Sequence, residues 1–388
     1  MSGTEVRVLS AVAEVPAPEW DGLAAHEPER ASPFVRHAFL DALEASGSAA
    51  PRAGWRARHV VLRRGGRLLA AAPAWLRHDS DGDFSRDWEW AAAAARARVP
   101  WYPKLLVGVP FTPATGRRVL VAEGEDRAAR VAEMVGALRR VAEEEGARTV
   151  QVLFPDGDEV RELEAAGLLA RVDLQYHWRN EGYRTFEEFL ARFPSKRRNA
   201  IRRERAAPAR QGIAIRTVRG DELRRDPAGW ARDVHALHAA ATDRMPWGMR
   251  WVNRDFYARV LSGMADAVEV VEARRGGALV AMAFNLASPA RLWGRHWGCI
   301  EVHPFLHFNV ALYHSIEECI RRGLRVFEGG AGGDHKLARG FEPAETWSAH
   351  LFLEPRLEAP IRRWVGEERR ARREAVERWR EEHPRLGG

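Results

Sequence analysis

The sequence predicts an α/β protein in which one helix-and-strand unit is used twice. In the first half, apolar residues at helical spacing precede the stop glycine Gly146 and TVQVLF at 149–154, a pattern typical of a buried strand. The same order recurs in the second half with Gly323 and LRVFE at 324–328. The two stop glycines lie 177 residues apart, and Gly167 and Gly340, which each precede an alternating strand pattern, lie 173 apart. This repetition indicates tandem α/β units.

The helix of each unit is predicted from its apolar spacing. The residues are Val131, Met134, Val135, Leu138, Val141 and Ala142 in the first unit, and Tyr313, Ile316 and Ile320 in the second. A chain of 388 residues is too long for one ordinary core, and 46% apolar residues suffice for two. We expect domains over 1–178 and 179–355, the second including a basic helical segment at 185–210, and a highly charged helix over 356–388.

Several classes of protein are disfavoured. No stretch reaches the roughly 18 apolar residues that a bilayer span requires, and the start, MSGTEVRVLSAVAEVP, lacks the pattern of a signal peptide. We therefore expect a cytoplasmic protein without a membrane span. The two cysteines, Cys299 and Cys319, lack metal-ligand spacing, and His303, His307 and His314 have no carboxylate cluster nearby. We expect neither a disulfide framework nor a metal site.

Charge is the next clue. A net charge of +7 and a pI near 9.9 favour an anionic partner such as a nucleotide, a coenzyme, RNA or a membrane surface. Of the 61 basic residues only three are lysines, Lys104, Lys196 and Lys336. Lysine offers a compact ammonium that can lose its proton on burial, whereas arginine is a planar fork that stays charged. The retained lysines either serve a chemical purpose or survive by accident.

The segment 185–210 carries the sharpest local signal. Thr185 and Glu188 form a capping-box pattern, and an apolar helix face follows that Pro194 should end. The run SKRRNAIRRER then places Arg198, Arg202 and Arg205 on one face of a second helix. That face could hold a phosphate or a carboxylated substrate, or it could belong to a solvated basic helix that covers the sheet.

Several strings of the sequence occur in the same order in one known family. They are DWEW at 87–90, WYPKLLVGVPFTPATGRRVL at 101–120, FEEFLARFPSKRRNAIRRERAAPARQGIAI at 186–215, HWGCIEVHPFLHFNVALYHSIEECIRRGL at 296–324 and FEGGAGGDHKLARGFEPAETWSAHLF at 327–352. Together they resemble the FemAB-like acyltransferases of the GNAT superfamily, in particular the predicted N-acyltransferase, "peptidoglycan biosynthesis-like" branch. The resemblance covers most of residues 30–355. It implies tandem GNAT-like domains, each a mixed, mostly antiparallel sheet flanked by helices.

The resemblance also implies a reaction, the transfer of an acyl or aminoacyl group from an activated carrier to an amine. We expect acyl-CoA as the donor, a small-molecule or peptide amine as the acceptor, and no tightly bound cofactor. One alternative is a FemX-like ligase that uses aminoacyl-tRNA. Another is a non-catalytic module that binds a peptide or a cell-wall precursor. The charged C-terminal helix either packs lightly or joins a homodimer.

Five residues are candidates for the chemistry. Glu328 ends a predicted strand before GGAGG and could accept a proton or orient an amine. His335 is suited to acid and base work at neutral pH, and Lys336 could stabilise an oxyanion or bind phosphate. Asn309 stands where the family more often carries a glutamate, and an asparagine cannot act as a base. Glu328, His307 or substrate-assisted proton loss would then take that role, unless the protein is inactive.

The remaining candidates are assigned to binding. Those expected to bind the acceptor are Asp87, Trp88, Trp90, Tyr102, Lys104, Arg295 and Trp297, although clustered aromatic residues equally suit core and rim packing. Those expected to bind the donor are Thr112, Thr115, Arg117, Lys196, Arg198 and Arg202. Neither half shows the glycine-rich pyrophosphate loop of a simple acetyltransferase. The identity of the donor therefore stays open at this stage.

Overall fold

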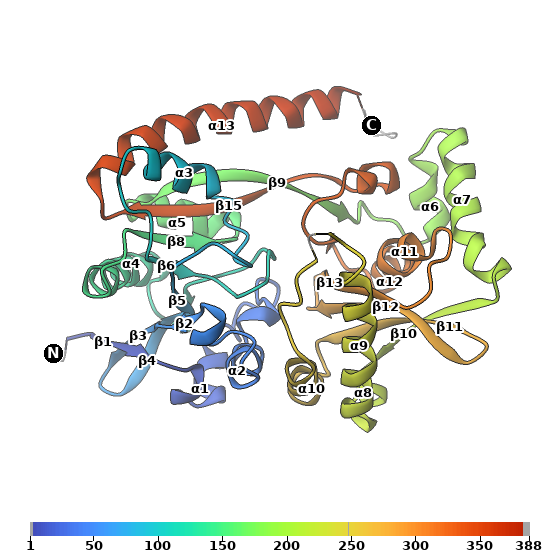
Figure 1. The fold of residues 1–388 in the computed structure, drawn as a ribbon, viewed down its shortest axis with the longest axis horizontal. Coiled ribbons are helices and arrows are strands. Elements are labelled where there is room, and N and C mark those ends of the chain that lie inside the picture. Colours follow the sequence, from blue (N-terminus) through green and yellow to red (C-terminus); the bar gives the residue numbers. More distant parts are fainter. Residues whose placement is uncertain (1–2, 247, 383–388) are drawn as a thin grey trace. The chain divides into compact units, whose positions relative to one another are not determined.

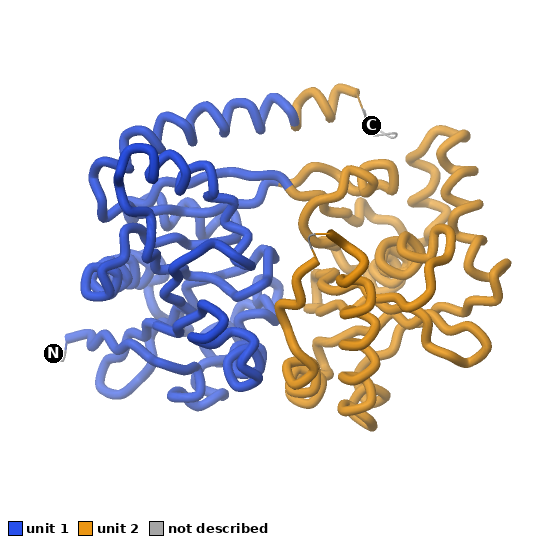
Figure 2. Tube along the Cα trace, in the orientation of Figure 1, with its two compact units in different colours: residues 1–174, 345–375 blue, residues 175–344, 376–388 orange. Residues whose placement is uncertain are grey.

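The chain forms two compact units. The structure, a computed structural model, describes residues 3–246 and 248–382. Unit 1 comprises Met1–Leu174 and Glu345–Ala375, and unit 2 comprises Gln175–Ala344 and Val376–Gly388 (Figure 2). Both contain mostly antiparallel sheets flanked by helices, so the predicted α/β class is confirmed (Figure 1).

Unit 1 holds two sheets. The first is antiparallel with strand order β1-β3-β4-β7, and the second contains the order β15-β8-β6-β5-β2, in which only β6 and β8 are parallel. Strand β9 starts in unit 1 and ends in unit 2, whereas β15 runs from unit 2 into unit 1. The bounds are β1 Glu5–Leu9, β2 Arg56–Ala57, β3 His59–Arg64, β4 Arg67–Ala72, β5 Ala74–Arg77, β6 Lys104–Val107, β7 Leu120–Val121, β8 Thr149–Leu153, β9 Leu169–Arg179 and β15 Glu342–Phe352.

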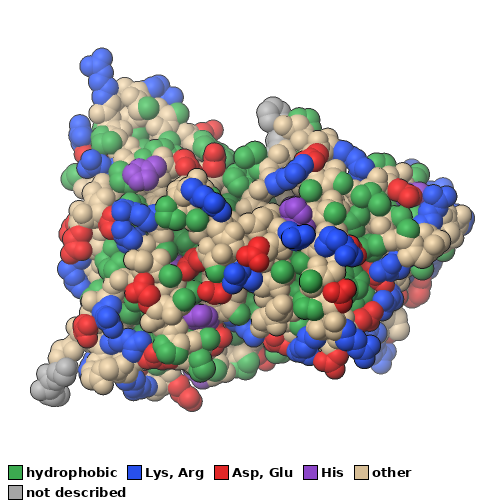
Figure 3. Space-filling view, turned by 60° about the horizontal axis from the view of Figure 1, so that its bottom comes forward, with side chains coloured by type: hydrophobic (Ala, Val, Ile, Leu, Met, Phe, Trp, Pro, Cys, Tyr) green, Lys and Arg blue, Asp and Glu red, His purple; other side chains and the backbone are tan. Residues whose placement is uncertain are grey.

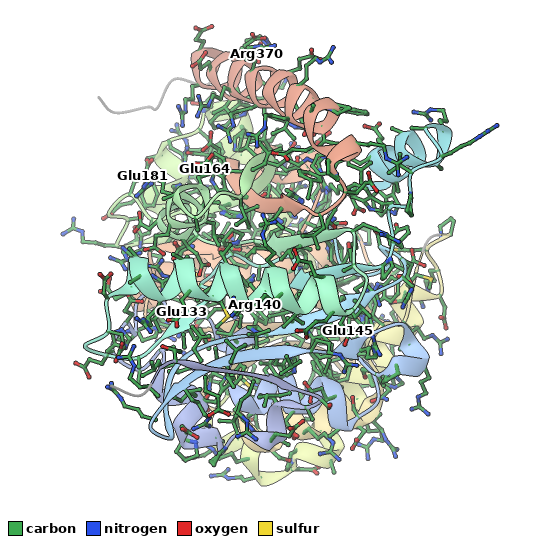
Figure 4. All side chains as sticks on the ribbon, turned by 90° about the vertical axis from the view of Figure 1, so that its left-hand side faces the viewer. Glu133, Arg140, Glu145, Glu164, Glu181 and Arg370 are labelled. Atoms are coloured by element: carbon green, nitrogen blue, oxygen red, sulfur yellow. The ribbon has the colours of Figure 1, made fainter. Side chains whose placement is uncertain are left out.

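Helix α4 covers the core of unit 1 and confirms the helix that apolar spacing predicts there. Its N-terminus is capped by Asp126, and its apolar face packs on β3, β4, β6 and β8. Figure 4 shows α4 crossing this side of the unit, with Glu133 and Arg140 along its length. The helices are η1 Val12–Glu14, α1 Ala17–Gly22, η2 Pro33–Val35, α2 His37–Ala45, η3 Pro51–Ala53, α3 Trp88–Arg96, α4 Arg127–Glu144, α5 Gly157–Ala165 and α13 Pro355–Glu382.

The charged C-terminal helix is α13, which begins in unit 1. Leu357, Ile361 and Val365 pack against Trp90 and Trp101, so this part of the helix is anchored by apolar contacts. Residues 383–388 of the predicted helix lie outside the described residues.

On the molecular face in Figure 3, basic side chains are interspersed with acidic ones, which limits any broad positive surface there. No helix among the described residues combines the length and hydrophobicity needed to cross a bilayer.

Unit 2 is built on one sheet with strand order β10-β11-β12-β13-β14-β9, in which only β13 and β14 are parallel. Its strands are β10 Ile213–Arg219, β11 Val268–Arg275, β12 Ala278–Ala287, β13 Arg291–Cys299 and β14 Val326–Glu328. Its helices are α6 Phe186–Ala191, α7 Ser195–Arg210, α8 Asp221–Arg225, α9 Pro227–Thr242, α10 Arg254–Gly263, α11 Leu306–Phe308, the π-helix η4 Asn309–Tyr313, α12 His314–Arg322 and the 3-10 helix η5 Asp334–Arg339.

Local signals in this half are confirmed. The Thr185 hydroxyl accepts from the Glu188 amide at 3.1 Å, and the Glu188 carboxylate accepts from the amide of Arg184, one residue before the cap, at 2.8 Å, a variant of the capping box. Helix α12 ends at Gly323, whose φ of 67° is left-handed and suits glycine. The chain then enters β14, which lies between β13 and β9 in the sheet of unit 2.

Candidate functional site

The most distinctive feature of unit 2 is a strand pair that diverges. Strand β13 pairs with β12 along its length, but with β14 only from Arg291 to Trp293, opposite Val326 to Glu328. Beyond Trp293, that edge of β13 has no neighbour among the described strands. A register shift in the β12–β13 pairing leaves Arg295 as an extra, bulged residue at the same level. The divergence leaves this edge of β13 without a partner strand beside the end of β14.

Glu328 lies at the point of divergence and is 2% exposed. Its Oε1 accepts from Nη1 of Arg291 at 3.1 Å, and its Oε2 lies 3.9 Å from Nε2 of His177. Burial lowers the pKa of His177, so this ring is neutral at physiological pH. Burial also lowers the pKa of Arg295, to about 10, with Glu328 among the charges that act on it. The carboxylate is therefore buried beside the guanidinium groups of Arg291 and Arg295.

The glycine loop after Glu328 is held by Lys336. Gly330 and Gly332 have φ values of 82° and 71°, which disfavour other residues. The Lys336 ammonium donates to the Gly330 carbonyl at 2.8 Å and to the Gly332 carbonyl at 2.6 Å. Lys336 is 5% exposed, and burial lowers its pKa to about 8. Its ammonium thus fixes the loop while remaining easier to deprotonate than an ordinary lysine.

His307 and His335 lie close together on an aromatic cluster of the same unit. Their ring centroids are 5.9 Å apart, and His307 also meets Trp297 at 4.9 Å. Burial lowers the pKa of His307 to about 4, which leaves it neutral, whereas His335 is exposed. The structure therefore gathers Trp297, His307 and His335 beside the loop that Lys336 holds.

Asn309 has a different environment. It is 5% exposed and opens the π-helix η4, a form of local bulge that is frequent at functional sites. Its Nδ2 donates to the Glu204 carbonyl and to the Phe305 carbonyl, both at 2.9 Å. Asn309 thus ties α7 to the turn just before α11, a task that needs an amide donor and that a carboxylate could not perform.

A buried carboxylate on α7 was missed by the sequence reasoning. Glu204 is 8% exposed, and its Oε2 accepts from the Tyr313 hydroxyl at 2.5 Å and from Arg339 at 2.9 Å. Its Oε1 accepts from Arg197 at 3.3 Å. The signal was visible, since Glu204 is the lone acid in the basic run. It joins α7, η4 and η5 around the candidate site.

A second missed cluster braces β13. The Tyr257 hydroxyl lies 2.8 Å from Nδ1 of His296, and the ring of His296 lies 4.6 Å from that of His238. Nδ1 of His238 lies 3.1 Å from the Trp297 carbonyl. Burial lowers the pKa of His296 well below its ordinary value and raises that of Tyr257 well above it, so both are neutral. No motif marks this cluster, because it is assembled from three separate elements.

In unit 1, Lys104 and Asp87 are fully buried in one ion-pair cluster. Nζ of Lys104 lies 2.8 Å from Oδ2 of Asp83 and 2.8 Å from Oδ2 of Asp87. Burial opposes the charged form of Asp87, but Lys104 and several hydrogen bonds hold its pKa well below the usual range. The half-buried Tyr102 joins this cluster, its hydroxyl 2.9 Å from the Ser80 hydroxyl. The polar atoms of Lys104 and Asp87 thus face each other in the interior.

The two tryptophans of DWEW lie in opposite environments. Trp88 is 57% exposed, whereas Trp90 is 1% exposed. The ring of Trp90 packs edge-on against Trp101 at 6.0 Å, and the Arg171 guanidinium lies 4.5 Å from its centroid. Of these two residues, only Trp88 presents a large surface to a ligand.

The candidate donor residues of unit 1 are engaged locally. The Thr112 hydroxyl donates to the Pro110 carbonyl at 2.8 Å, and Thr115 follows in the same segment. Arg117 is 5% exposed and lies 3.2 Å from Asp156 and 3.4 Å from Glu162. Its charge is therefore compensated within unit 1.

The basic helix α7 is also partly compensated. Arg202 pairs with Glu187 at 2.6 Å, and Arg205 pairs with Glu317. Arg198 donates to the Phe193 carbonyl and to the Ser195 hydroxyl, while Lys196 is exposed. Nearby glutamates thus offset part of the charge that the sequence places on this helix. Over residues 3–246 and 248–382, no cluster of three metal-ligating side chains is present.

The structure thus separates the candidates between its units. Those in unit 2 are Glu328, His335, Lys336, His307, Asn309, Arg295, Trp297, Lys196, Arg198 and Arg202. Those in unit 1 are Asp87, Trp88, Trp90, Tyr102, Lys104, Thr112, Thr115 and Arg117. The roles assigned to them remain predictions.

Solved structures share the fold at low sequence identity. FemX is 10% identical with a TM-score of 0.54, over 90% of this chain and 98% of that chain. A C-terminal domain (DUF2156) of a protein described as a lysylphosphatidylglycerol synthetase from Agrobacterium fabrum is 14% identical with a TM-score of 0.54, over 92% and 96%. L-PGS from Bacillus licheniformis is 10% identical with a TM-score of 0.50, over 87% and 97%. At these identities the likeness shows the fold alone.

Comparison of the sequence with family profiles identifies the family, which the structural likeness alone does not. Among curated proteins, none matches the sequence. The profile of the FemAB-like family, described as peptidoglycan biosynthesis/recognition, matches residues 11–385, nearly the whole chain. The resemblance inferred from the motif strings is thereby confirmed, and the chain belongs to the FemAB-like family.

Proposed function

We propose that this protein is an amide-forming N-acyltransferase whose chemistry takes place in unit 2, with an acyl-CoA as donor and an amine as acceptor. Membership of the FemAB-like family supports acyl or aminoacyl transfer in general. In the proposed reaction the amine nitrogen attacks the thioester carbonyl and loses a proton. The C–N bond forms, the C–S bond breaks, and the coenzyme leaves as a thiol.

The observation that carries the proposal is the buried carboxylate of Glu328 where β13 and β14 diverge. Beyond Trp293 no described strand covers this edge of β13, so an extended ligand would lie along it as an added strand lies along a sheet edge, although the Trp297 and Cys299 carbonyls already accept from His238 and Arg244. A flexible thioester arm that carries amide groups fits such an edge. Its reactive carbonyl would then lie near the end of β14.

Glu328 is the group proposed to accept the proton of the attacking amine. A general base must lie within hydrogen-bond reach of that proton, directly or through one water. Arg291 donates to the carboxylate at 3.1 Å and so fixes its position at the end of β14. The ring of His177 is neutral and lies 3.9 Å from the carboxylate, too far for a direct hydrogen bond.

Lys336 and the glycine loop are proposed to serve the developing negative charge. A preorganised cation stabilises an oxyanion more strongly in a buried site than in water. Because Lys336 already fixes the carbonyls of Gly330 and Gly332, its ammonium would be held in place before the substrate arrives. Replacing it with methionine should therefore lower kcat more than it raises KM for the amine.

The pairing of α7 favours a coenzyme thioester over a charged tRNA. Binding to RNA depends on cations that are free to neutralise phosphates. Arg197, Arg202 and Arg205 instead pair with glutamates of unit 2, so only part of the charge of α7, including that of Arg203 and Arg210, is left for an anion. A compact carrier needs fewer such contacts than a nucleic acid does.

The test compares the two donors on the full-length protein. Thermal stability is measured with acetyl-CoA and longer acyl-CoAs, and separately with aminoacylated tRNA, since a bound donor raises Tm by mass action. We expect a saturable rise with an acyl-CoA. A rise in Tm with aminoacylated tRNA but with no acyl-CoA would overturn the donor assignment in favour of the tRNA-dependent ligase. Binding of an amine acceptor without any turnover would favour the non-catalytic module.

Turnover assays on variants then test the role of Glu328 as the general base. Glu328→Gln keeps the shape of the side chain and removes the base, so we expect a loss of about 100-fold or more in kcat. Glu345→Gln is the matched control, because this glutamate on β15 is exposed. Equal activity of Glu328→Gln and the control would eliminate Glu328 as the base.

A further inference from the structure

Unit 2 exposes an unusual group of apolar side chains. Over residues 3–246 and 248–382, seven large apolar side chains are strongly exposed, and five of them lie on two loops of unit 2. The five are Met245 at 54%, Met249 at 54%, Ile300 at 48%, Val302 at 80% and Phe305 at 44%. Single exposed apolar residues are ordinary, but a group of them marks an interaction surface. We call this group the loop patch.

The two loops of the loop patch are joined by hydrogen bonds. Arg244 donates to the Cys299 carbonyl at 3.0 Å and to the Ile300 carbonyl at 2.7 Å, so the segment bearing Met245 lies beside the end of β13. The Gln211 side chain, just after α7, donates to the Pro304 carbonyl at 3.3 Å. The end of α7 therefore borders the loop patch on another side.

Phe305 is held in an uncommon backbone conformation. Its φ of 64° lies in the left-handed region, which is unfavourable for a bulky residue. The Asn309 amide and its side-chain Nδ2 both donate to the Phe305 carbonyl, at 3.1 Å and 2.9 Å, and hold the turn. Strain of this kind persists where the surrounding structure imposes it, and it clusters at functional sites. Here it keeps an aromatic side chain half exposed.

The charges around the loop patch are predominantly positive. Arg203 and Arg210 are exposed near the end of α7, and Arg210 donates to the Arg203 carbonyl at 3.1 Å. Neither they nor Arg244 forms an ion pair with a carboxylate in the described part of the chain. No carboxylate of the described residues thus offsets these three charges, although the Arg244 guanidinium is also held by the Cys299 and Ile300 carbonyls.

The acidic residues of the same loops are already compensated. Glu301 lies 3.4 Å from Arg275 and 2.7 Å from His303, and Asp243 pairs with Arg250. An anionic surface that approached the loop patch would therefore meet uncompensated cations and few free carboxylates.

We propose that the loop patch docks unit 2 on the surface of an anionic lipid bilayer. Aliphatic and aromatic side chains would enter the interface, and Arg203, Arg210 and Arg244 would contact lipid phosphates. Short apolar insertions combined with a basic rim give reversible binding of this kind. Ile300 and Val302 offer no flat surface on which nucleic-acid bases could stack, which favours lipid over RNA. The inference is independent of the proposed donor, and it would place the acceptor at a membrane.

The test is sedimentation of the full-length protein with vesicles. We expect binding to vesicles of phosphatidylglycerol and phosphatidylcholine, little binding to phosphatidylcholine alone, and weakening by salt. Val302→Asp should reduce the partition coefficient by at least about 10-fold. Val8→Asp is the matched control, because Val8 is also exposed, at 40%, but lies on β1. The charge reversal Arg203→Glu with Arg210→Glu should weaken binding to a similar extent or more.

Each contrary result overturns the inference. No retention by anionic vesicles, equal loss in Val302→Asp and Val8→Asp, or retention by polyuridylate but not by vesicles would each exclude the lipid surface. Turnover of an acyl-CoA with a soluble amine is measured in parallel, and Val302→Asp should leave it unchanged. Loss of vesicle binding with intact turnover affects the docking inference alone, whereas absent turnover with intact binding affects only the proposed function.

Discussion

Replacing Lys104 with methionine should destabilise unit 1 severely. The Lys104 ammonium lies 2.8 Å from Asp83 and 2.8 Å from Asp87, and all three side chains are fully buried. Methionine preserves much of the volume but leaves two carboxylates without their cation. Removing one partner of a buried ion pair typically costs about 3–5 kcal/mol, because the remaining charge is uncompensated. We expect a loss of that size at neutral pH.

The loss should fall mainly on Asp83. Asp87 keeps four neutral donors: the hydroxyl of Ser80 at 2.6 Å, that of Ser85 at 2.8 Å, and the Trp101 indole and the Gln151 amide, both at 3.0 Å. Burial already raises the pKa of Asp83, and without Lys104 nothing offsets that burial to the same degree. A carboxyl whose pKa is raised in the folded state stabilises the fold below its unfolded pKa and loses this contribution as the pH rises. The variant should therefore recover part of its stability in acid.

The assay is urea unfolding followed by tryptophan fluorescence, at about pH 5 and about pH 7. Lys196→Met is the matched control, since Lys196 is exposed and should change stability by less than about 0.5 kcal/mol. Adding Asp83→Asn to Lys104→Met should restore part of the loss. If Lys104→Met unfolds at the same urea concentration as the control, the cluster does not stabilise the fold, and the predicted binding role of Lys104 gains ground.

Three further outcomes follow from buried polar contacts in unit 2. Between about pH 7 and about pH 9.5, the unfolding free energy of the native protein should rise by about 2 kcal/mol relative to that of Lys336→Met. The reason is that Lys336 loses its proton near pH 8 in the folded state and only at higher pH in the unfolded state. Equal pH dependence of the unfolding free energy in the two proteins, measured in urea, would contradict this. Tyr313→Phe should cost about 1.5–3 kcal/mol by removing a donor to the buried Glu204, and an unchanged urea midpoint would refute it. Asn309→Glu should lower the unfolding free energy by at least about 2 kcal/mol, since the new carboxylate would face the carbonyls of Glu204 and Phe305. A melting temperature equal to that of the native protein would contradict this.

Elements determined by local patterns could be predicted from the sequence. Helix α4 and strand β8 follow from the 3.6-residue apolar spacing and from a buried run bounded by Gly146. The start of α6 follows from Thr185 and Glu188, which meet within one helical turn. Glu328 was predicted to end a strand before a glycine loop, and the structure places it there. Each of these features depends on residues only a few positions apart.

Features built from distant residues could not be predicted in this way. Asp83 was not singled out, because its pairing with Lys104 depends on how a loop meets β6. The divergence of β13 from β14 is a property of the sheet, and a strand pattern carries no trace of where its neighbour stops. Glu204 likewise acquires its importance only when η4 and η5 bring Tyr313 and Arg339 to it.

The surroundings of the three lysines explain why lysine, and not arginine, occupies two of these positions. Lys104 presents one compact charge to two carboxylates and two hydroxyls, and Lys336 presents one to two backbone carbonyls of a tight loop. A planar guanidinium could not converge on either set of acceptors from so small a volume. Two of the three retained lysines are therefore buried ammonium groups whose geometry arginine cannot reproduce, while Lys196 is exposed. In an arginine-rich chain, a retained lysine thus indicates first a confined cation, and only its surroundings can indicate chemistry: the lowered pKa of Lys336 beside the Glu328 loop meets that condition, and the fully paired Lys104 does not.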